Sequence, residues 1–404
     1  MILNVYSKYL LISTLLNAIT LCISGSMQAS YKISGMVLNK ETNEPIPLVE
    51  VFISGSTYGS ITNEEGKFEL ATSYFPCQLI ASHVSYAPFN QLVDEESRTD
   101  LTIRLIPYQY EIKEITVESE HRRKKNLELF KRGLIGSDDS MSRRKDNLEL
   151  FKRGFLGWDD IARNCTILND SVLSFTWDSL VFRASAYQPV LIDNPKLGYR
   201  IKIILKNFKL IYKPEAYKRI HRGRKIKPDV TDAIYHIACY FHYSPYSPET
   251  KKEQEQIEKT RLRVYYGSKM HFLRALYSGQ PKIQGYDINP GITIAPTTYS
   301  NIMDSWSGIK IIFLDQEGYP EKLMIYPEKP MLISFYQDHT GKPIDLNLDS
   351  GIHLDPLQSM VTFANKKCTI RNNGSTLDYS LVFSGEIGDQ RISHMLPDDY
   401  NPGD

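Results

Sequence analysis

The chain carries GMV at residues 35–37, NEPI at residues 43–46 and SITNEEGKF at residues 60–68, set among alternating apolar and polar residues. Successive side chains of a strand point to opposite faces, so this period of two predicts strands with one face in a core. Gly, Asn and Pro between the runs favour tight turns. The stretch therefore predicts a small antiparallel β-sandwich. Its alternating apolar positions are at 33–37, 49–53, 68–70, 101–105 and 115–117.

The same residues resemble the carboxypeptidase-regulatory-like domain family, over residues about 31–119. The resemblance rests on Gly35, the NEPI turn, Gly55 and TNEEGKF at residues 62–68. Members of this family have a transthyretin-like, seven-stranded antiparallel β-sandwich with a carbohydrate-binding-like fold, and they are widespread in the cell envelope of Bacteroidota. Asn63 stands where the family usually has Asp, which leaves the expected turn intact because Asn also suits tight turns. The resemblance implies a scaffold or binding module without chemistry of its own.

Residues 1–29 are predicted to be a signal peptide. Lys8 precedes a mostly apolar run at 9–23, and small residues up to Ala29 offer cleavage sites. The run is short and interrupted by polar residues, which disfavours a membrane-spanning helix. Leucine precedes Cys22, where a lipoprotein signal would have a small residue. We therefore expect an exported protein that is periplasmic or associated with the outer membrane.

Charge and cysteine content limit the classes of partner and cofactor. The formal net charge is +1, so no global field would attract nucleic acid, which we do not expect as a partner. The cysteines that remain after cleavage are far apart and lack C-x-x-C spacing, which disfavours a zinc site. No cofactor is expected. These cysteines, predicted to be buried and with their disulfide status left open, are Cys77, Cys165, Cys239 and Cys368.

Residues 120–158 are predicted to form a basic helical linker with an internal duplication. NLELFKRGLIG at 126–136 recurs 21 residues later as NLELFKRGFLG at 147–157. Each copy has apolar residues at i, i+3 and i+7, which predicts a short amphipathic helix. We expect the second copy to dock on a core. The basic residues of this linker and of 218–225 either bind an anionic membrane surface or form solvated loops.

Residues 159–404 are predicted to be a β-rich domain with one long inserted helix at about 248–278. Ser247 suits the N-cap of this helix, Pro248 its first position and Gly279 its end. From Phe155 onward the chain resembles an uncharacterised segment that follows such modules, a resemblance that implies no activity. It rests on several motifs, among them FLG at 155–157, GSKMHFLRAL at 267–276 and LPDDY at 396–400.

One group of metal-ligand residue types occurs within a short stretch, at His236, Cys239 and His242. On a strand the two histidines would share a face and the cysteine would point away, which disfavours a three-ligand site. His271 lies near Arg274 on the predicted helix and could act as a general base or bind an anion. No nucleophile or carboxylate can be assigned to it, so we expect it to pack with polar anchoring.

Adjacent carboxylates occur at residues 138–139, 159–160 and 398–399. Neighbouring side chains point to different sides of a helix or strand, so turn or cap roles are expected rather than an acid–base pair. The sequence also lacks the common hydrolase and nucleotide-binding motifs. We therefore assign no catalytic, cofactor-binding or metal residue from the sequence.

These observations predict a mainly β, non-enzymatic envelope protein that acts as a binding or scaffold module for a protein partner or a surface glycan. The alternative is an envelope peptidase or glycan hydrolase whose site is assembled within residues 156–400. A cavity with converging His, Asp or Glu side chains in that region would favour the enzyme.

Overall fold

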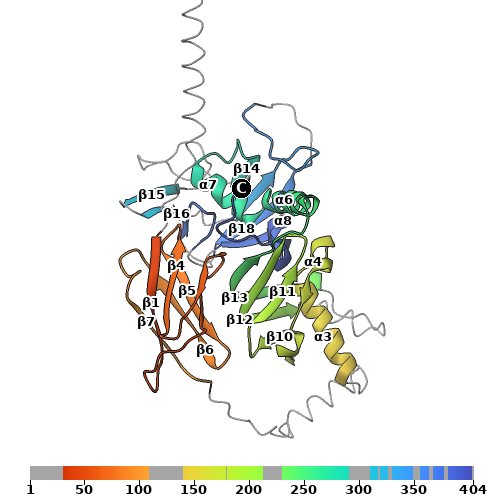
Figure 1. Ribbon diagram of the computed structural model, residues 1–404. Coiled ribbons are helices and arrows are strands. Elements are labelled where there is room, and N and C mark those ends of the chain that lie inside the picture. Colours follow the sequence, from red (N-terminus) through yellow and green to blue (C-terminus); the bar gives the residue numbers. More distant parts are fainter. Residues whose placement is uncertain are drawn as a thin grey trace, which may run out of the picture.

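The computed structural model describes residues 31–108, 140–178, 180–212, 230–290, 310–316, 319–325, 330–348, 355–363, 367–376 and 381–402. The predicted signal peptide, the first copy of the duplication and the basic stretch at 218–225 lie outside the described residues. The described chain forms an N-terminal sandwich and two further β-rich units (Figure 1). None of its described helices is long and apolar enough to cross a membrane.

The N-terminal unit is a sandwich of a three-stranded sheet, β4-β1-β7, and a four-stranded sheet, β3-β2-β5-β6. Its core lies between the sheets, where Ile33, Val37 and Ile103 are fully buried. A sandwich of seven strands is confirmed, while the predicted run at 115–117 lies outside the described residues. One pair departs from the antiparallel pattern because β7 runs parallel to β1. The strands are β1 (Tyr31–Asn39), β2 (Glu50–Ile53), β3 (Gly59–Ile61), β4 (Lys67–Thr72), β5 (Cys77–His83), β6 (Tyr86–Val93) and β7 (Leu101–Leu105).

The second unit is a six-stranded sheet covered by helix α3 (Ser140–Phe155). Phe151 and Phe155 are fully buried and pack edge-on against Phe208 of β12, so the second copy of the duplication does dock on a core. The short helix α4 (Asp160–Asn164) follows α3. The strands are β8 (Thr166–Ile167), β9 (Leu173–Asp178), β10 (Val181–Ala186), β11 (Val190–Asn194), β12 (Tyr199–Tyr212) and β13 (Ala233–Pro245).

The third unit contains a four-stranded sheet, β14-β17-β18-β20, and a three-stranded sheet, β15-β16-β19. The region predicted as one β-rich domain therefore holds two hydrophobic cores, one in each of these units. The strands are β14 (Tyr286–Pro290), β15 (Lys310–Gln316), β16 (Tyr319–Ile325), β17 (Met331–Phe335), β18 (Leu357–Phe363), β19 (Lys367–Ile370) and β20 (Leu381–Gly385), followed by α8 (Glu386–Asp389).

The single helix predicted at about 248–278 is two helices, α6 (Lys251–Tyr265) and α7 (Lys269–Ser278). The chain breaks at Gly267, which has a φ of 75° and lies against Phe335, where a side chain would clash. The N-cap is Thr250 rather than Ser247, because its side chain accepts a hydrogen bond from the Glu253 amide. Gly279 ends α7 in the left-handed conformation, as predicted.

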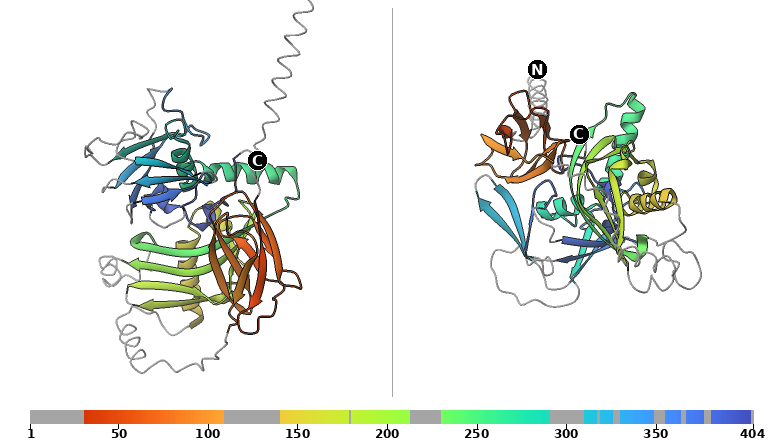
Figure 2. Two further views of the ribbon diagram at one scale, coloured as in Figure 1. Left: turned by 90° about the vertical axis from the view of Figure 1, so that its left-hand side faces the viewer. Right: turned by 90° about the horizontal axis from the view of Figure 1, so that it is seen from below.

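The sandwich packs on the second unit through the outer face of its four-stranded sheet (Figure 2). Phe52 of β2 and Ile80 of β5 are fully buried there against Ile204 of β12. The Phe52 ring also stacks on His242 of β13 at 4.9 Å between centroids. This sheet face is therefore covered by the protein's own chain.

Candidate functional site

The turn between β2 and β3 joins the sandwich to β13 by backbone hydrogen bonds. Gly55 N–H donates to the Phe241 carbonyl at 2.9 Å, and Tyr243 N–H donates to the Ser56 carbonyl at 3.0 Å. A salt bridge between Lys202 and Glu50 adds a charged contact across the same boundary. The turn is thereby fixed as one wall of the junction between the three units.

The C-terminal segment, residues 396–402, passes through this junction. Asp398 N–H donates to the Gly55 carbonyl at 2.6 Å. The Asp399 carboxylate accepts hydrogen bonds from the Thr57 amide, at 2.9 Å, and from the Thr57 hydroxyl. The segment is therefore tied to the sandwich turn by its main chain and by one carboxylate.

Arg274 of α7 ties the same segment to the third unit. Its guanidinium donates to the Tyr400 carbonyl at 2.8 Å and to the Asp398 carbonyl at 3.2 Å. Its Nε donates to the Asn373 carbonyl, in the turn after β19, at 2.8 Å. One side chain thus connects a helix, a turn and the C-terminal segment, and this is a positioning role rather than the anion or base chemistry considered from the sequence.

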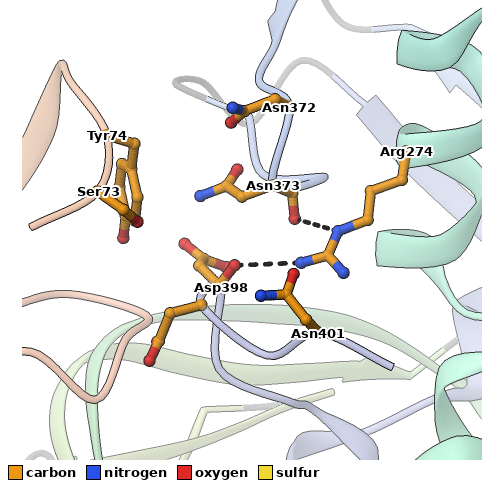
Figure 3. A pocket seen from close by; sticks show the side chains of 8 residues that line it. Ser73, Tyr74, Arg274, Asn372, Asn373, Asp398 and Asn401 are labelled. Carbon is orange, nitrogen blue, oxygen red and sulfur yellow. Dashed lines mark hydrogen bonds between the residues drawn. The ribbon is translucent and has the colours of Figure 1, made fainter. Parts of the chain in front are cut away.

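A polar cavity lies where these elements meet (Figure 3). Its volume is about 150 Å³. Asn372 and Asn401 are exposed, so the cavity reaches solvent on their side. The sandwich, the third unit and the C-terminal segment all contribute walls, which are formed by Ser73, Tyr74, Arg274, Asn372, Asn373, Asp398, Asp399 and Asn401.

Two buried polar groups on the cavity wall have no partner in the described structure. The Tyr74 hydroxyl makes no hydrogen bond although the side chain is only 6% exposed. The Asn373 amide nitrogen is likewise buried and unpaired. Its orientation is fixed, because Asn373 Oδ1 accepts from the Ser375 amide at 3.0 Å and from the Ser375 hydroxyl at 2.7 Å. Both atoms have almost no accessible surface, so they lie within the wall and do not face the open space of the cavity.

Asp398 supplies the carboxylate of the cavity. Burial raises the pKa of this carboxyl to about 7, an effect that Arg371 opposes and Asp399 reinforces by their charges. Arg371 is itself buried, with its guanidinium 5.7 Å from the centroid of the Tyr74 ring. The Asp398 side chain keeps some exposure, and it lines the cavity, so its carboxyl can reach a bound group.

His236, Cys239 and His242 lie on β13, as the strand interpretation required, and do not form a site. His236 is exposed, Cys239 is buried and His242 stacks on Phe52. Among the described residues no group of three His, Cys, Asp or Glu side chains could hold a metal ion. Cys239 packs in the core of the second unit, and His242 belongs to the junction with the sandwich.

His271 is a buried hydrogen-bonding centre within the third unit. Its Nδ1 accepts from the Gly267 amide at 3.2 Å and from the Tyr286 hydroxyl at 2.9 Å, so Nε2 carries the proton that it shares with Gln284 at 3.1 Å. Burial lowers the pKa of His271 to about 4, which keeps the imidazole neutral. Packing with polar anchoring is confirmed.

Asp159, His394 and Ser393 lie in the order of a hydrolase triad. His394 Nε2 is 2.7 Å from Asp159 Oδ2, and Ser393 Oγ is 3.1 Å from His394 Nδ1. The serine is fully buried, however, and its hydroxyl donates to the Leu156 carbonyl at 2.5 Å. Asp159 also caps α4 through the Ala162 amide. The group therefore anchors the C-terminal segment and cannot present a nucleophile to a substrate.

The adjacent carboxylates divide between caps and the cavity. Asp159 is a helix cap, as expected, and Asp160 lies at the surface 3.8 Å from Lys196. Residues 138–139 lie outside the described residues. Asp398 and Asp399 lie in a turn, as expected, which the Tyr400 amide closes by donating to the Pro397 carbonyl at 2.8 Å. Asp398 also lines the cavity, which the sequence did not predict.

The cysteines and the basic residues that can be described offer no further site. Burial raises the pKa of the Cys77 and Cys165 thiols to about 12, so neither is a reactive thiolate. Arg144 donates to two carbonyl groups at the start of β9, and Lys152 pairs with Glu149. The buried free cysteines are Cys77, Cys165, Cys239 and Cys368.

No curated protein sequence matches this chain. Three solved structures show a slight likeness. The first is a 9R-lipoxygenase from Cyanothece PCC8801, with 10% identity and a TM-score of 0.16, covering 63% of this chain and 49% of the lipoxygenase. This chain therefore spans about half the length of that enzyme.

The other two structures come from Bacteroides. A candidate membrane-associated protein of unknown function from Bacteroides fragilis has 9% identity and a TM-score of 0.16, covering 78% of this chain and 92% of its own. A candidate carbohydrate-binding protein from Bacteroides uniformis has 7% identity and a TM-score of 0.15. The match covers 84% of this chain and 98% of that protein. Likeness at these TM-scores carries no argument about fold or function.

The sequence of the N-terminal sandwich gives a definite match. Residues 33–117 fit the model of the CarboxypepD_reg-like domain family. This agrees with the strand order and with the glycine and asparagine turns of the described part of that region. The N-terminal unit of this protein is therefore a CarboxypepD_reg-like domain.

Proposed function

We propose that this protein is a non-enzymatic, exported envelope protein that binds a surface glycan in the polar cavity between the sandwich, the third unit and the C-terminal segment. The observation that carries the proposal is the polar cavity of about 150 Å³, whose lining includes asparagine, arginine and aspartate side chains. Concave sites with a few converging polar groups are where small polar ligands bind.

Binding accounts for the cavity better than chemistry does. Of its two carboxylates, Asp399 is already held by the Thr57 amide and hydroxyl. Arg274 donates from Nε and one terminal nitrogen to three carbonyl groups of the surrounding chain. The cavity also offers asparagine amides and the Asp398 carboxyl, which are groups that recognise hydroxyl groups.

A glycan suits the cavity better than a protein partner. A stable protein interface buries about 800 Å² on each side and has an apolar centre. The cavity here has polar walls and a volume of about 150 Å³. It admits one small polar group at the end of a chain.

The test is capture of polysaccharide from the envelope of the native host by the full mature chain. Asn372 is exposed at the mouth of the cavity, so Asn372→Trp should block entry and reduce capture at least five-fold. Asn347→Trp places the same side chain at an exposed position in another turn and should leave capture unchanged. Equal capture by both variants would refute the proposal.

The envelope location rests on the predicted signal peptide. Fractionation of the native host, with sequencing of the mature amino terminus, should find the protein outside the cytoplasm and beginning after one of residues 24–29. An intact Met1 on cytoplasmic protein would refute export. Release of the protein from anionic vesicles as salt rises would separately support a membrane contact through the basic stretches.

A glycan hydrolase is the second candidate, favoured by one observation. Burial raises the pKa of Asp398 to about 7, and a carboxyl that is protonated near neutral pH can act as a general acid. Hydrolysis of captured polysaccharide that is lost in Asp398→Asn, with binding retained, would establish the enzyme. Binding without cleavage by the unmodified chain would exclude this role.

A further inference from the structure

We infer that the part of the six-stranded sheet that the sandwich leaves open binds an acidic polysaccharide, through a row of cations on the face opposite helix α3. This surface is separate from the polar cavity, so the inference goes beyond the proposed function and does not depend on it. Figure 2 shows the strands of this sheet extending past the sandwich. We call the surface the open sheet face, and it is defined by Thr176, Arg183, Tyr187, Lys206, Lys209 and His236.

The alternation of side chains along the strands places the cations on the face away from the core. Phe182 of β10 and Phe208 of β12 are buried in the core beneath α3. Successive side chains of a strand point to opposite faces, so Arg183 and Lys209, which follow these phenylalanines, point away from α3. His236 of β13 is exposed and stands opposite Lys209 in the register of the sheet. The three side chains therefore form a row across three neighbouring strands.

The row places like charges side by side. Arg183 of β10 is directly opposite Lys209 of β12, and the Cβ atoms of such pairs are about 5 Å apart. Like charges directly opposite each other destabilise a sheet. Thr176 continues the row on β9 and supplies a hydroxyl group, not a carboxylate. An anionic ligand would therefore relieve a repulsion that is present in the free protein.

The carboxylates on this side of the sheet leave the cations uncompensated. Within the described residues, neither Arg183 nor Lys209 forms an ion pair with a carboxylate. Asp178, at the end of β9, is the carboxylate diagonal to Arg183. Lys206 adds a third cation, with its ammonium 5.7 Å from the centroid of the Tyr240 ring. Two further carboxylates on this side have other partners, in the ion pairs Lys202–Glu50 and Arg200–Asp193.

This excess of positive charge is local. The chain as a whole has a net charge of only +1, and the three cations lie outside the basic stretches identified from the sequence. A concentration of one sign of charge on a surface attracts ligands of the opposite sign. The open sheet face therefore has the charge that complements a polyanion.

An aromatic ring lies on the same face. Tyr187 is 59% exposed, and its amide donates to the Val172 carbonyl at 3.3 Å, which continues the pairing of β9 and β10. It follows Arg183 at an even spacing along the chain, so the alternation places both side chains on one face. An exposed tyrosine ring offers an apolar surface with a polar tip, on which a sugar ring can pack. The combination of a ring, a hydroxyl group and cations favours an acidic sugar over an acidic peptide.

The shape of the molecule favours an extended chain over a bilayer. The sandwich packs on this same face, where Phe52 and Ile80 contact Ile204 of β12. Ile204 precedes Lys209 by about 16 Å of strand. The sandwich therefore stands beside the cations as a wall (Figures 1 and 2). A flat membrane would meet the sandwich before it reached the sheet, whereas a narrow polysaccharide can lie along the sheet beside the wall.

The experiment measures binding of the full mature chain to immobilised polygalacturonate, with dextran as the neutral polysaccharide. The chain should bind polygalacturonate and not dextran. Binding should weaken about tenfold between about 50 and about 200 mM salt, because each anionic contact releases counterions. Arg183→Gln and Lys209→Gln should each weaken it about threefold, and the double variant about tenfold. Tyr187→Ala should weaken binding about threefold without changing its dependence on salt.

Lys252→Gln is the matched control. It removes the same charge from an exposed position on α6, away from the open sheet face, and should leave binding unchanged. Thermal unfolding provides the second measurement. Lys209→Gln removes a like-charge contact, so its unfolding temperature should be no lower than that of the unmodified chain. Weaker binding without a loss of stability distinguishes a binding role from a structural one.

Equal binding by Arg183→Gln, Lys209→Gln and Lys252→Gln would overturn the assignment of the open sheet face. Dextran binding as tight as polygalacturonate binding would overturn the acidic class of ligand. Tighter binding of polyglutamate or of phosphatidylglycerol vesicles, reduced by Lys209→Gln, would overturn the choice of a polysaccharide. The basic stretch at 218–225 is tested by replacing its lysines and arginines with glutamine. Loss of all binding in that variant, with no effect of Lys209→Gln, would also overturn the inference.

Discussion

The interior of the sandwich and the cavity beside it treat buried polar groups in opposite ways. Thr62, only 2% exposed in the sandwich, accepts from the Val49 amide at 2.8 Å and donates to the Ile46 carbonyl at 2.8 Å. Tyr74, buried to a similar extent on the cavity wall, has an unpaired hydroxyl. The contrast separates a buried polar group that stabilises the fold by its hydrogen bonds from one that has no hydrogen bond in the described structure.

His271, in the third unit, is also a buried polar side chain whose hydrogen bonds are made. Its substitution should change the free energy of unfolding more than the other substitutions predicted below. His271→Ala removes the acceptor for Gly267 and Tyr286 and the donor for Gln284 at a residue that is 1% exposed. We expect a loss of about 3 kcal/mol in the free energy of unfolding, measured by urea denaturation. His236→Ala, at an exposed position on β13, should change it by less than about 0.5 kcal/mol. Similar values for both variants would contradict the network.

The sandwich and the cavity also differ in how far the sequence could predict them. Alternation at Ile33 and Val37 predicts the sandwich because burial of one strand face is a local property. Gly279 predicts a helix end for the same reason. The break at Gly267 was missed because it depends on Phe335, which lies far along the chain.

The cavity could not be predicted because no local pattern records it. Tyr74, Arg274, Asn373 and Asp398 come from separate loops and a helix, and only the packing of the sandwich, the third unit and the C-terminal segment brings them together. Two sequence motifs contain residues of the cavity. GSKMHFLRAL at 267–276 contains Arg274, and LPDDY at 396–400 contains Asp398. The motifs carried a resemblance to an uncharacterised segment but did not indicate that these residues meet.

Asp398 should make the free energy of unfolding depend on pH. Its pKa is raised by burial from 3.8 to about 7, so the folded state holds a proton that the unfolded state releases between those values. This contribution to stability is fully present below about pH 4 and is lost as the pH rises through about 7. The Asp398→Asn variant has no carboxyl at this position, so its stability does not fall in this way as the pH rises.

We therefore expect Asp398→Asn to match the unmodified chain near pH 4.5 and to exceed it in stability by about 2 kcal/mol at pH 8, a value reduced for partial exposure of the side chain. Urea denaturation across this range measures the difference. Asp338→Asn, at a turn outside the cavity, is the control and should not show a gain that grows with pH. A gap between Asp398→Asn and the unmodified chain that does not change with pH would refute the burial of this carboxyl.

The smallest expected effect is a gain in stability, whereas most substitutions in a core reduce stability. Tyr74→Phe removes a buried hydroxyl that has no partner and keeps the ring, so the ligand-free protein should gain about 1 kcal/mol in the free energy of unfolding. Tyr286→Phe, which instead deletes a hydroxyl bonded to His271, should lose about 1 kcal/mol. The pair differs only in whether the oxygen has a partner. Destabilisation by both variants would mean that the Tyr74 hydroxyl already stabilises the fold, and the contrast with Thr62 would then fail.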